Sequence, residues 1–393
     1  MKSRLNWVLL WGLMQQMVTD LTRRKLLKMA LASASLTSAS SMVGCATNLV
    51  GHSQRDSVVS NKQSAIIGCS RRLSGGYAAV VADSTGMPLY QFALPARGHG
   101  IAVQPHGSLA AAFGRRPGHY MQVFDYQTGG QFPLIIAKPN RYFYGHGVFS
   151  ADGQYLFATE GERGTSQGII GVYRISTLSD KGDIEKVSEF TGFGIGPHEV
   201  VLADNDTLAI GVGGVHTKGR TPVNLESMQP ALVYLDIKTG ELIEQAVLTN
   251  KQLSIRHLSV TESGDVVCGQ QFRGEPEQAA PLVAIHQRGK ALEHLQADEE
   301  EWLRFNHYIA SIASLDGYLL ATSPRGNCYG IWREIDKQLI DLQPLIDASG
   351  VGVINSKWVV GSGSGKMLTV SQHGQQRVSH SPVLWDNHWS VLA

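Results

Sequence analysis

The segment RYFYGHGVFSADGQYLFATEG, residues 141–161, predicts two short β-strands joined by a tight turn. Its Asp152-Gly153 pair stands between apolar runs, and Asp-Gly tolerates the positive φ angles that hairpin turns require. His146 is the unusual residue of the segment, because it stands between two glycines where a strand normally carries a β-branched residue. Similar segments recur along the chain, so this histidine belongs to a repeated pattern.

Six units share one order of features: strand, turn, strand, glycine-rich loop, strand, turn and a looser fourth strand. They begin at Gly98, Gly145, Pro197, Arg256, Asn306 and Ser349. Four strands in a unit of roughly 40–50 residues are typical of a β-propeller blade. The 43 glycines and a charged fraction of only 17% agree with an all-β chain.

The two ends of the repeat region complement each other. The C-terminal NHWSVLA, from Asn387, resembles a first strand that has no second strand after it. The N-terminal AIIGCSRR, GYAAVVADSTG and PLYQFALP are three strands that lack an innermost partner. Pairing Trp389–Leu392 with the strand around Ile66 and Ile67 completes a seventh unit and leaves no free sheet edge. We therefore expect an all-β, seven-bladed β-propeller, closed by the C-terminal strand joining the N-terminal blade.

In this alignment, histidine opens the innermost strand of six blades. The exception is the sixth repeat unit, where Gly350 holds the position. Neutral imidazole is the commonest protein ligand for first-row transition metals, and a site made only of histidines suits copper, iron, nickel or zinc better than calcium or magnesium. We predict a transition-metal site, with copper or iron favoured and zinc as a further candidate, built from His99, His146, His198, His257, His307 and His388.

Three or four of these histidines on one ion, or two ions sharing the set, fit the reach of imidazole better than six ligands on one ion. The alternative is a wet channel, in which each histidine only bonds water and neighbouring carbonyl groups.

A series of arginines is predicted on the same face, in the loops between the second and third strands. The guanidinium group is permanently charged and suits carboxylate and phosphate groups. These residues predict recognition of an anion: a phosphorylated or carboxylated small molecule, a metal chelate, or an acidic partner surface. The alternative is pairing with nearby acidic residues. The candidate anion-binding residues are Arg72, Arg115, Arg163, Arg273 and Arg325.

The first 62 residues predict export and anchoring. TRRKLLK, residues 22–28, matches the twin-arginine pattern, and MVGC before Ala46 resembles a lipoprotein processing box with Cys45 as the lipidated residue. We expect a signal segment over 1–44, with Met17 as a possible true start, a lipid-anchored polar tether over 45–62, and the propeller over 63–393. The stretch 29–43 is too short and serine-rich for a transmembrane helix. The expected location is the periplasm, with the lipid in the outer membrane as the only membrane contact.

Composition excludes some functions. The net charge of +1 does not favour nucleic-acid binding. The cysteines after the leader have no CxxC or haem-attachment spacing, so buried free thiols are expected in preference to one disulfide; they are Cys69, Cys268 and Cys328. The chain has no HExxH or strand-to-helix GxGxxG motif, and no nucleophile elbow, because its G-x-S-x-G match at residues 164–168 stands in a loop between two expected strands; no catalytic residue is assigned.

Two other functions stay open at this point. One is a lactonase-like or oxidoreductase-like propeller enzyme, with a histidine as general base and arginine holding an anion. The other is a protein-interaction platform in which the histidines are structural.

A twin-arginine leader followed by blades that open with RGHG, YGHG, GPHE, RHL, NHY and DNHW resembles the bacterial family called domain of unknown function 1513. The resemblance covers essentially the whole chain after the leader. It implies an exported protein encoded beside imelysin-type lipoproteins and di-haem thiol-oxidoreductase-like proteins, in a setting of iron acquisition. Imelysin-type or di-haem periplasmic proteins are therefore expected partners, and iron or other metal handling is the expected role.

Overall fold

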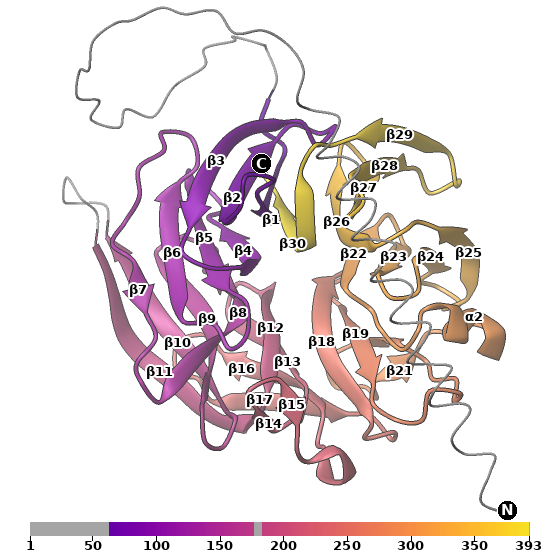
Figure 1. Cartoon of the computed structure of the whole chain (residues 1–393). Coiled ribbons are helices and arrows are strands. Elements are labelled where there is room, and N and C mark those ends of the chain that lie inside the picture. The colour runs from indigo at the N-terminus through magenta and orange to yellow at the C-terminus, as the bar shows by residue number, and fades with distance from the viewer. Residues whose placement is uncertain (1–62, 177–182, 393) are drawn as a thin grey trace, which may run out of the picture. The chain divides into compact units, whose positions relative to one another are not determined.

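The computed structural model describes residues 63–176 and 183–392. In these residues the strands form seven four-stranded antiparallel sheets and one two-stranded sheet. The four-stranded sheets are arranged as the blades of a β-propeller around a common centre (Figure 1). The predicted all-β, seven-bladed architecture is confirmed. The predicted signal segment, Cys45 and the tether lie outside the described residues.

One strand of each blade faces the centre of the ring, and consecutive inner strands contact one another around the whole circle. In chain order these inner strands are β4 (Gly98–Val103), β8 (Arg141–Phe149), β12 (Pro197–Asp204), β18 (Leu253–Val260), β22 (Ser311–Leu315), β26 (Ala348–Ile354) and β30 (Leu384–Val391). The second strands are β1 (Ile66–Arg71), β5 (Leu109–Gly114), β9 (Tyr155–Glu162), β13 (Thr207–Val212), β19 (Val266–Phe272), β23 (Tyr318–Ser323) and β27 (Lys357–Ser362).

The two outer layers complete each blade. The third strands are β2 (Tyr77–Ala82), β6 (Tyr120–Asp125), β10 (Gln167–Ser176), β16 (Ala231–Asp236), β20 (Val283–His286), β24 (Cys328–Arg333) and β28 (Lys366–Val370). The outermost are β3 (Pro88–Leu94), β7 (Ile135–Ile136), β11 (Asp183–Ile195), β17 (Leu242–Val247), β21 (Glu293–His294), β25 (Leu339–Pro344) and β29 (Gln376–His380). Outside the blades lie the strand pair β14 (Thr217–Lys218) and β15 (Thr221–Pro222), the 3₁₀ turn η1 (Leu225–Ser227) and the helix α2 (Glu299–Arg304).

The ring closes as the sequence predicts. β30 is the innermost strand of the blade formed by β1, β2 and β3, and it pairs Val391 with Ile66 and Ser390 with Ile67. The backbone N–H of Leu392 also donates to the carbonyl of Ala65 at 2.8 Å. Because the last strand of the chain completes the first blade, the inner layer has no free strand edge.

Packing between blades explains why the middle strands have near-continuous apolar sequences. Both faces of a blade are covered by its neighbours, so every residue of β5 and β13 is buried. Ile67 and Phe92 of the first blade, for example, pack in one cluster with Ile101 and Phe124 of the second. The outer strand β11 instead consists mostly of exposed and partly covered residues, with only Phe190 and Phe193 buried. The predicted thiols fit this core: all three cysteines in the described residues are buried and free.

The fifth unit departs from the predicted register. Its inner strand β22 begins at Ser311, five residues after the expected start at Asn306. The helix α2 precedes it, closed at its N-terminus by a capping box between Asp298 and Glu301. The chain then turns through Asn306 and His307, whose φ angles of 47° and 56° are left-handed. This turn ends the helix before the strand begins, and no repeat pattern in the sequence signals it.

No helix in the described part of the chain is long and apolar enough to cross a membrane.

Candidate metal centre

β-bulges place the channel histidines. The pairing of β4 with β5 shifts between Gly98 and Ile101, around His99, and that of β8 with β9 shifts between Phe143 and Gly147, around His146. Comparable shifts occur beside the histidines of β12, β18 and β30. A similar shift occurs around Gly350 in β26, where no histidine stands. Because a bulge bends the strand and redirects a side chain, the shifts in the five histidine-bearing strands turn five imidazoles toward the channel.

The five imidazoles form a closed ring, here called the histidine pentad: His99, His146, His198, His257 and His388. Starting from His388, each ring centroid lies 4.5, 4.8, 4.7, 4.7 and 4.5 Å from the next. The last of these distances joins His257 back to His388, because the two blades between them carry no histidine at this position. Ser311 and Gly350 stand there instead, and Ser311 lines the same channel cavity as His146 and His388.

The pentad is sequestered from solvent. Four of its members are buried and His198 is partly buried. Burial is the main cause that lowers the pKa of all five imidazoles below the ordinary value, and the charges of neighbouring imidazoles and arginines add to it for most of them. The pentad is therefore neutral at neutral pH, which is the state in which imidazole binds a metal.

Two carboxylates hold three of the rings. Asp386 lies 3.4 Å from Nδ1 of His99 and accepts a 2.6 Å bond from Nε of Arg97. Although burial opposes ionisation, His99 and the nearby arginines keep the pKa of Asp386 well below its usual range. Glu199 lies 3.3 Å from Nδ1 of His257 and 3.7 Å from Nδ1 of His146.

Glu199 is also held by the backbone, because Leu258 N–H donates to it at 3.0 Å. Burial raises the pKa of Glu199. Sequence reasoning missed both acids, although Glu199 directly follows His198 and Asp386 stands two residues before His388.

Four ring nitrogens of the pentad are buried and have no hydrogen-bond partner among the described residues. They are Nε2 of His146, His257 and His388 and Nδ1 of His198. In both His146 and His257 the other nitrogen faces Glu199, which is within hydrogen-bond distance of His257 only, and the unpartnered nitrogen of each ring is left for a ligand. Buried polar atoms without partners are rare, and here they converge.

The nitrogens form two triads of possible metal ligands. His99, His146 and His388 make one, and His146, His198 and His257 make the other, with the ligand atoms of each triad within 4.8 Å of one another. Nitrogens that bind one ion at about 2.0–2.1 Å lie roughly 3–4 Å from one another. Small rotations of the rings would therefore bring the nitrogens of a triad to the spacing that coordination requires. His146 belongs to both triads, which makes it the central residue of the site.

The backbone around the rings fixes their spacing. The hydroxyl of buried Thr159 lies between the carbonyl oxygens of His146 and His198, at 3.0 and 2.9 Å, and its single proton can be donated to either. A side chain at Gly100 would lie 2.8 Å from Nδ1 of His146, and one at Gly145, whose φ is +111°, would lie 2.8 Å from Cδ2 of His99. The glycines beside the histidines are therefore required by the close packing of neighbouring inner strands.

The channel beside the pentad is narrow. A cavity of about 110 Å³ is lined by the residues that follow the histidines along the inner strands, among them Gly147, Glu199 and Leu258. This volume admits an ion and a few waters rather than a large organic substrate.

The structure does not bring His307 to the pentad. It precedes β22 and lies in the turn after α2, where its Nε2 is 2.8 Å from the carbonyl oxygen of Gln278 and its ring packs on Phe272 at 5.1 Å. The predicted set of six channel histidines therefore separates into five that converge and one that does not.

The predicted arginines are in the loops between second and third strands, but they differ in their partners. Arg163 is exposed and bonds the carbonyl of Pro139, and exposed Arg325 lies over the ring of Tyr308 at 4.6 Å. Arg115 lies 3.8 Å from Asp386. Arg72 and Arg273 each keep a buried Nε without a partner among the described residues. Sequence reasoning also missed Arg256, which is buried beside His257.

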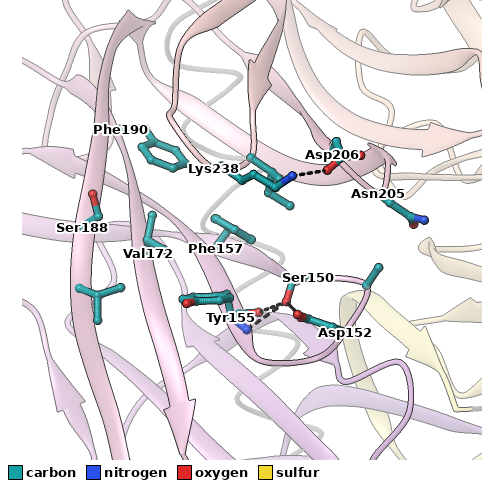
Figure 2. Close-up of a pocket in the computed structure, with 13 residues that line it drawn as sticks. Ser150, Asp152, Tyr155, Phe157, Val172, Ser188, Phe190, Asn205, Asp206 and Lys238 are labelled. Atoms are coloured by element: carbon teal, nitrogen blue, oxygen red, sulfur yellow. Dashed lines mark hydrogen bonds and ion pairs between the residues drawn. The ribbon is translucent and has the colours of Figure 1, made fainter.

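A second pocket lies between two blades, at the ends that carry the turns after the inner strands. About 520 Å³ in volume, it is lined by Ser150 and Asp152 in the turn after β8 and by Asp206 after β12, with Phe157 in its wall (Figure 2). Its polar groups satisfy one another, since Lys238 pairs with Asp206 at 3.1 Å and Ser150 bonds Asp152. Unlike the pentad, this pocket contributes no buried polar atom that lacks a partner in the described chain.

The fold and the site together define the class: a seven-bladed β-propeller with a group of buried imidazoles that could hold a metal ion at its channel. A family model described as "Protein of unknown function (DUF1513)" matches residues 92–392, and the chain belongs to this family. No curated protein matches the chain.

Proposed function

We propose that this propeller binds a first-row transition-metal ion at the histidine pentad and serves in the handling of iron or copper outside the cytoplasm. The observation that carries the proposal is the convergence of four buried ring nitrogens that have no partner among the described residues. Leaving a buried donor or acceptor unsatisfied costs about 1–3 kcal/mol for each group, and a bound ion would remove that cost.

The donor set supports the choice of metal. Neutral imidazole suits copper, iron, nickel and zinc, whereas calcium and magnesium prefer several oxygen ligands. The acids of the site, Asp386 and Glu199, face the Nδ1 side of the rings and are placed to orient them. Such outer partners fix the tautomer of a ligating histidine and raise its basicity.

Binding of metal to the purified protein tests the proposal directly. Titration calorimetry with copper, iron and zinc, together with elemental analysis, should show stoichiometric binding to the wild-type protein. Replacing His146 and His257 by Ala removes two nitrogens that face the site and should weaken binding beyond the roughly 10–100-fold that loss of an outer partner costs.

Two single variants provide the controls. His307→Ala should leave the affinity unchanged, because His307 lies off the pentad. His106→Ala, in an exposed turn, reports the contribution of surface histidines. Equal binding by the double variant, or wild-type binding no tighter than that of surface histidines, would leave the wet channel as the explanation.

The extracytoplasmic part of the proposal rests on the leader. TRRKLLK and the cysteine at 45 support export of the folded protein and attachment to the outer membrane, and the resemblance to the family supports imelysin-type or di-haem periplasmic proteins as partners. Replacing Arg23 and Arg24 by Lys should block export, and Cys45→Ser should release a soluble periplasmic form. Fractionation of cells measures both; a Cys45→Ser protein that stays with the membrane would contradict the lipid anchor.

A further inference from the structure

Arg256 is a buried cation for which the described residues provide no counter-ion. Its side chain is only 2% exposed, and its Nε and Nη2 have no hydrogen-bond partner among the described residues. A charged group taken out of water costs several kcal/mol unless an opposite charge and hydrogen bonds compensate. The residue also directly precedes His257 of the pentad. An uncompensated guanidinium at this point of the channel requires an explanation.

The groups around Arg256 are further cations. The charges of Arg116 and Arg273 lie close enough to lower the pKa of Arg256 further, after burial has lowered it most. Arg116 Nη1 and Arg273 Nε are themselves buried and unpartnered in the described part of the chain, while Arg273 Nη2 donates to Gln271 at 2.8 Å. No ion pair between these three arginines and a carboxylate occurs within residues 63–176 and 183–392. We call Arg116, Arg256 and Arg273 the arginine cradle.

Neutral polar groups beside the cradle are also unsatisfied. Gln270 is fully buried, and neither atom of its amide has a partner among the described residues. Tyr144 lies under Arg116, whose Cζ is 6.0 Å from the ring centroid, and Tyr308 lies near both Arg256 and Arg273. Apart from Arg273 Nη2, these guanidinium and amide groups therefore include several buried donors that meet no acceptor among the described residues.

The cradle borders the pentad. The charge of Arg256 acts on His257 and on His198, and the hydroxyl of Tyr308 accepts a 3.2 Å bond from Asn387, the residue before His388. The guanidinium of Arg256 is held against the neighbouring blade: a side chain at Gly213 would lie 3.0 Å from its Cζ. The group is thus fixed in place by packing rather than by a salt bridge.

We propose that the arginine cradle is an oxyanion site, which takes the carboxylate or phosphate groups of a multivalent anion beside the histidine pentad. Guanidinium groups bind such groups by paired N–H donors, and two or three of them offset the charge of a multivalent anion. The bound anion supplies the negative charge that no carboxylate of the described residues provides to Arg256. Anion binding itself needs no metal; only the joint capture of a metal and its anionic chelator rests on the proposed function.

Calorimetry of the metal-free protein with citrate and with inorganic phosphate, at neutral pH and low salt, tests the site. We expect one of the two to bind with a sub-millimolar Kd and to raise the thermal midpoint of unfolding in proportion to its concentration. Binding of citrate alone identifies a carboxylate site, and binding of phosphate alone identifies a phosphate site. Failure of the wild-type protein to bind either anion at about 10 mM would overturn the proposal.

Arg256→Met separates an anion site from a structural arginine. Methionine keeps much of the volume and removes the buried charge, so the anion-free variant should unfold at a higher temperature while binding the anion at least 10-fold more weakly. Arg288→Gln is the matched control, because Arg288 pairs with Asp204 at 2.7 Å in an exposed position, and it should leave anion affinity unchanged. Equal anion binding by Arg256→Met, or a lower midpoint without anion, would contradict the proposal.

Different variants test the metal site and the anion site. In a titration without chelator, Arg256→Met should still bind metal, whereas the His146→Ala, His257→Ala protein should lose metal and keep the anion. Loss of anion binding in the histidine variant, with wild-type anion binding by Arg256→Met, would place the anion on the histidines and overturn the assignment to the cradle.

Discussion

At the scale of single residues, the pentad consists of histidines that burial keeps neutral. Each folded-state pKa is lowered, whereas the unfolded chain has the ordinary value of about 6.5. Above that pH neither state binds a proton at these residues, and stability does not change with pH on their account. As the pH falls below about 6.5, the unfolded state takes up protons that the folded state refuses, so stability falls.

We therefore predict that the metal-free protein loses stability between pH 7 and pH 5, with a slope that the pentad dominates. Urea unfolding across this range measures the effect. Replacing His198 and His388 by Gln should flatten the slope, and His106→Gln, in an exposed turn, should not. An unchanged slope in the double variant would show that these imidazoles do not remain neutral in the folded protein.

Some residues of the site could be predicted from the sequence and others could not. Five of the six candidate histidines converge, because they share one position in a repeat that the sequence displays. His307 does not converge with them, because it lies in a left-handed turn after α2 that is not part of the repeated pattern. Glu199, Asp386 and Arg256 were missed because each belongs to only one blade, and a repeated pattern cannot mark a residue that occurs once.

At the scale of elements, the β-bulges and glycines of the inner strands create the site. Alternation along a strand predicts which residues face the channel, but a bulge shifts that alternation by one residue. The positions of the bulges therefore could not be predicted from the sequence, although the glycines around His99 and His146 stand beside them. Two of those glycines have a physical reason in the site itself, because a methyl group at Gly100 would meet the imidazole of His146 and one at Gly145 would meet that of His99.

We predict that Gly145→Ala lowers both stability and metal affinity. The φ of +111° strains any side chain, and the new Cβ would lie 2.8 Å from Cδ2 of His99, so the ring must move. The strain alone costs about 1–3 kcal/mol. Gly75→Ala is the matched control, because Gly75 has a φ of +93° with nothing within 4 Å of the added Cβ.

Thermal unfolding and metal titration of both variants measure the difference. Gly75→Ala should show only the strain and keep full metal affinity. If Gly145→Ala binds metal as tightly as Gly75→Ala does, the position of His99 does not matter to the site.

At the scale of the whole molecule, the sequence predicted the architecture well. The blade count followed from complementary fragments at the two ends, and β30 pairs with β1 in the expected register around Ile66 and Ile67. The distances within the pentad could not be predicted, because they depend on how tightly seven inner strands close. Closure also explains why the chain's last strand carries a pentad residue, His388: the ring and the site are completed by the same strand.

Deleting residues 387–393 should therefore damage the fold as well as the site. The deletion removes Trp389 and the part of β30 that pairs with Ile66 and Ile67, which leaves an unpaired edge on β1 and uncovers buried side chains worth roughly 1.5–3 kcal/mol each. We expect a clearly lower thermal midpoint and association between molecules through the open edge.

Full-length His388→Ala separates the two effects, because it lacks the imidazole and keeps the strand: it should bind metal more weakly while its midpoint stays near that of the wild type. Calorimetric unfolding and light scattering measure the outcome. A truncated protein that unfolds at the wild-type temperature would mean that β30 does not hold the ring closed, and the positions of His99 and His257, which both lie 4.5 Å from His388, would then depend on other contacts.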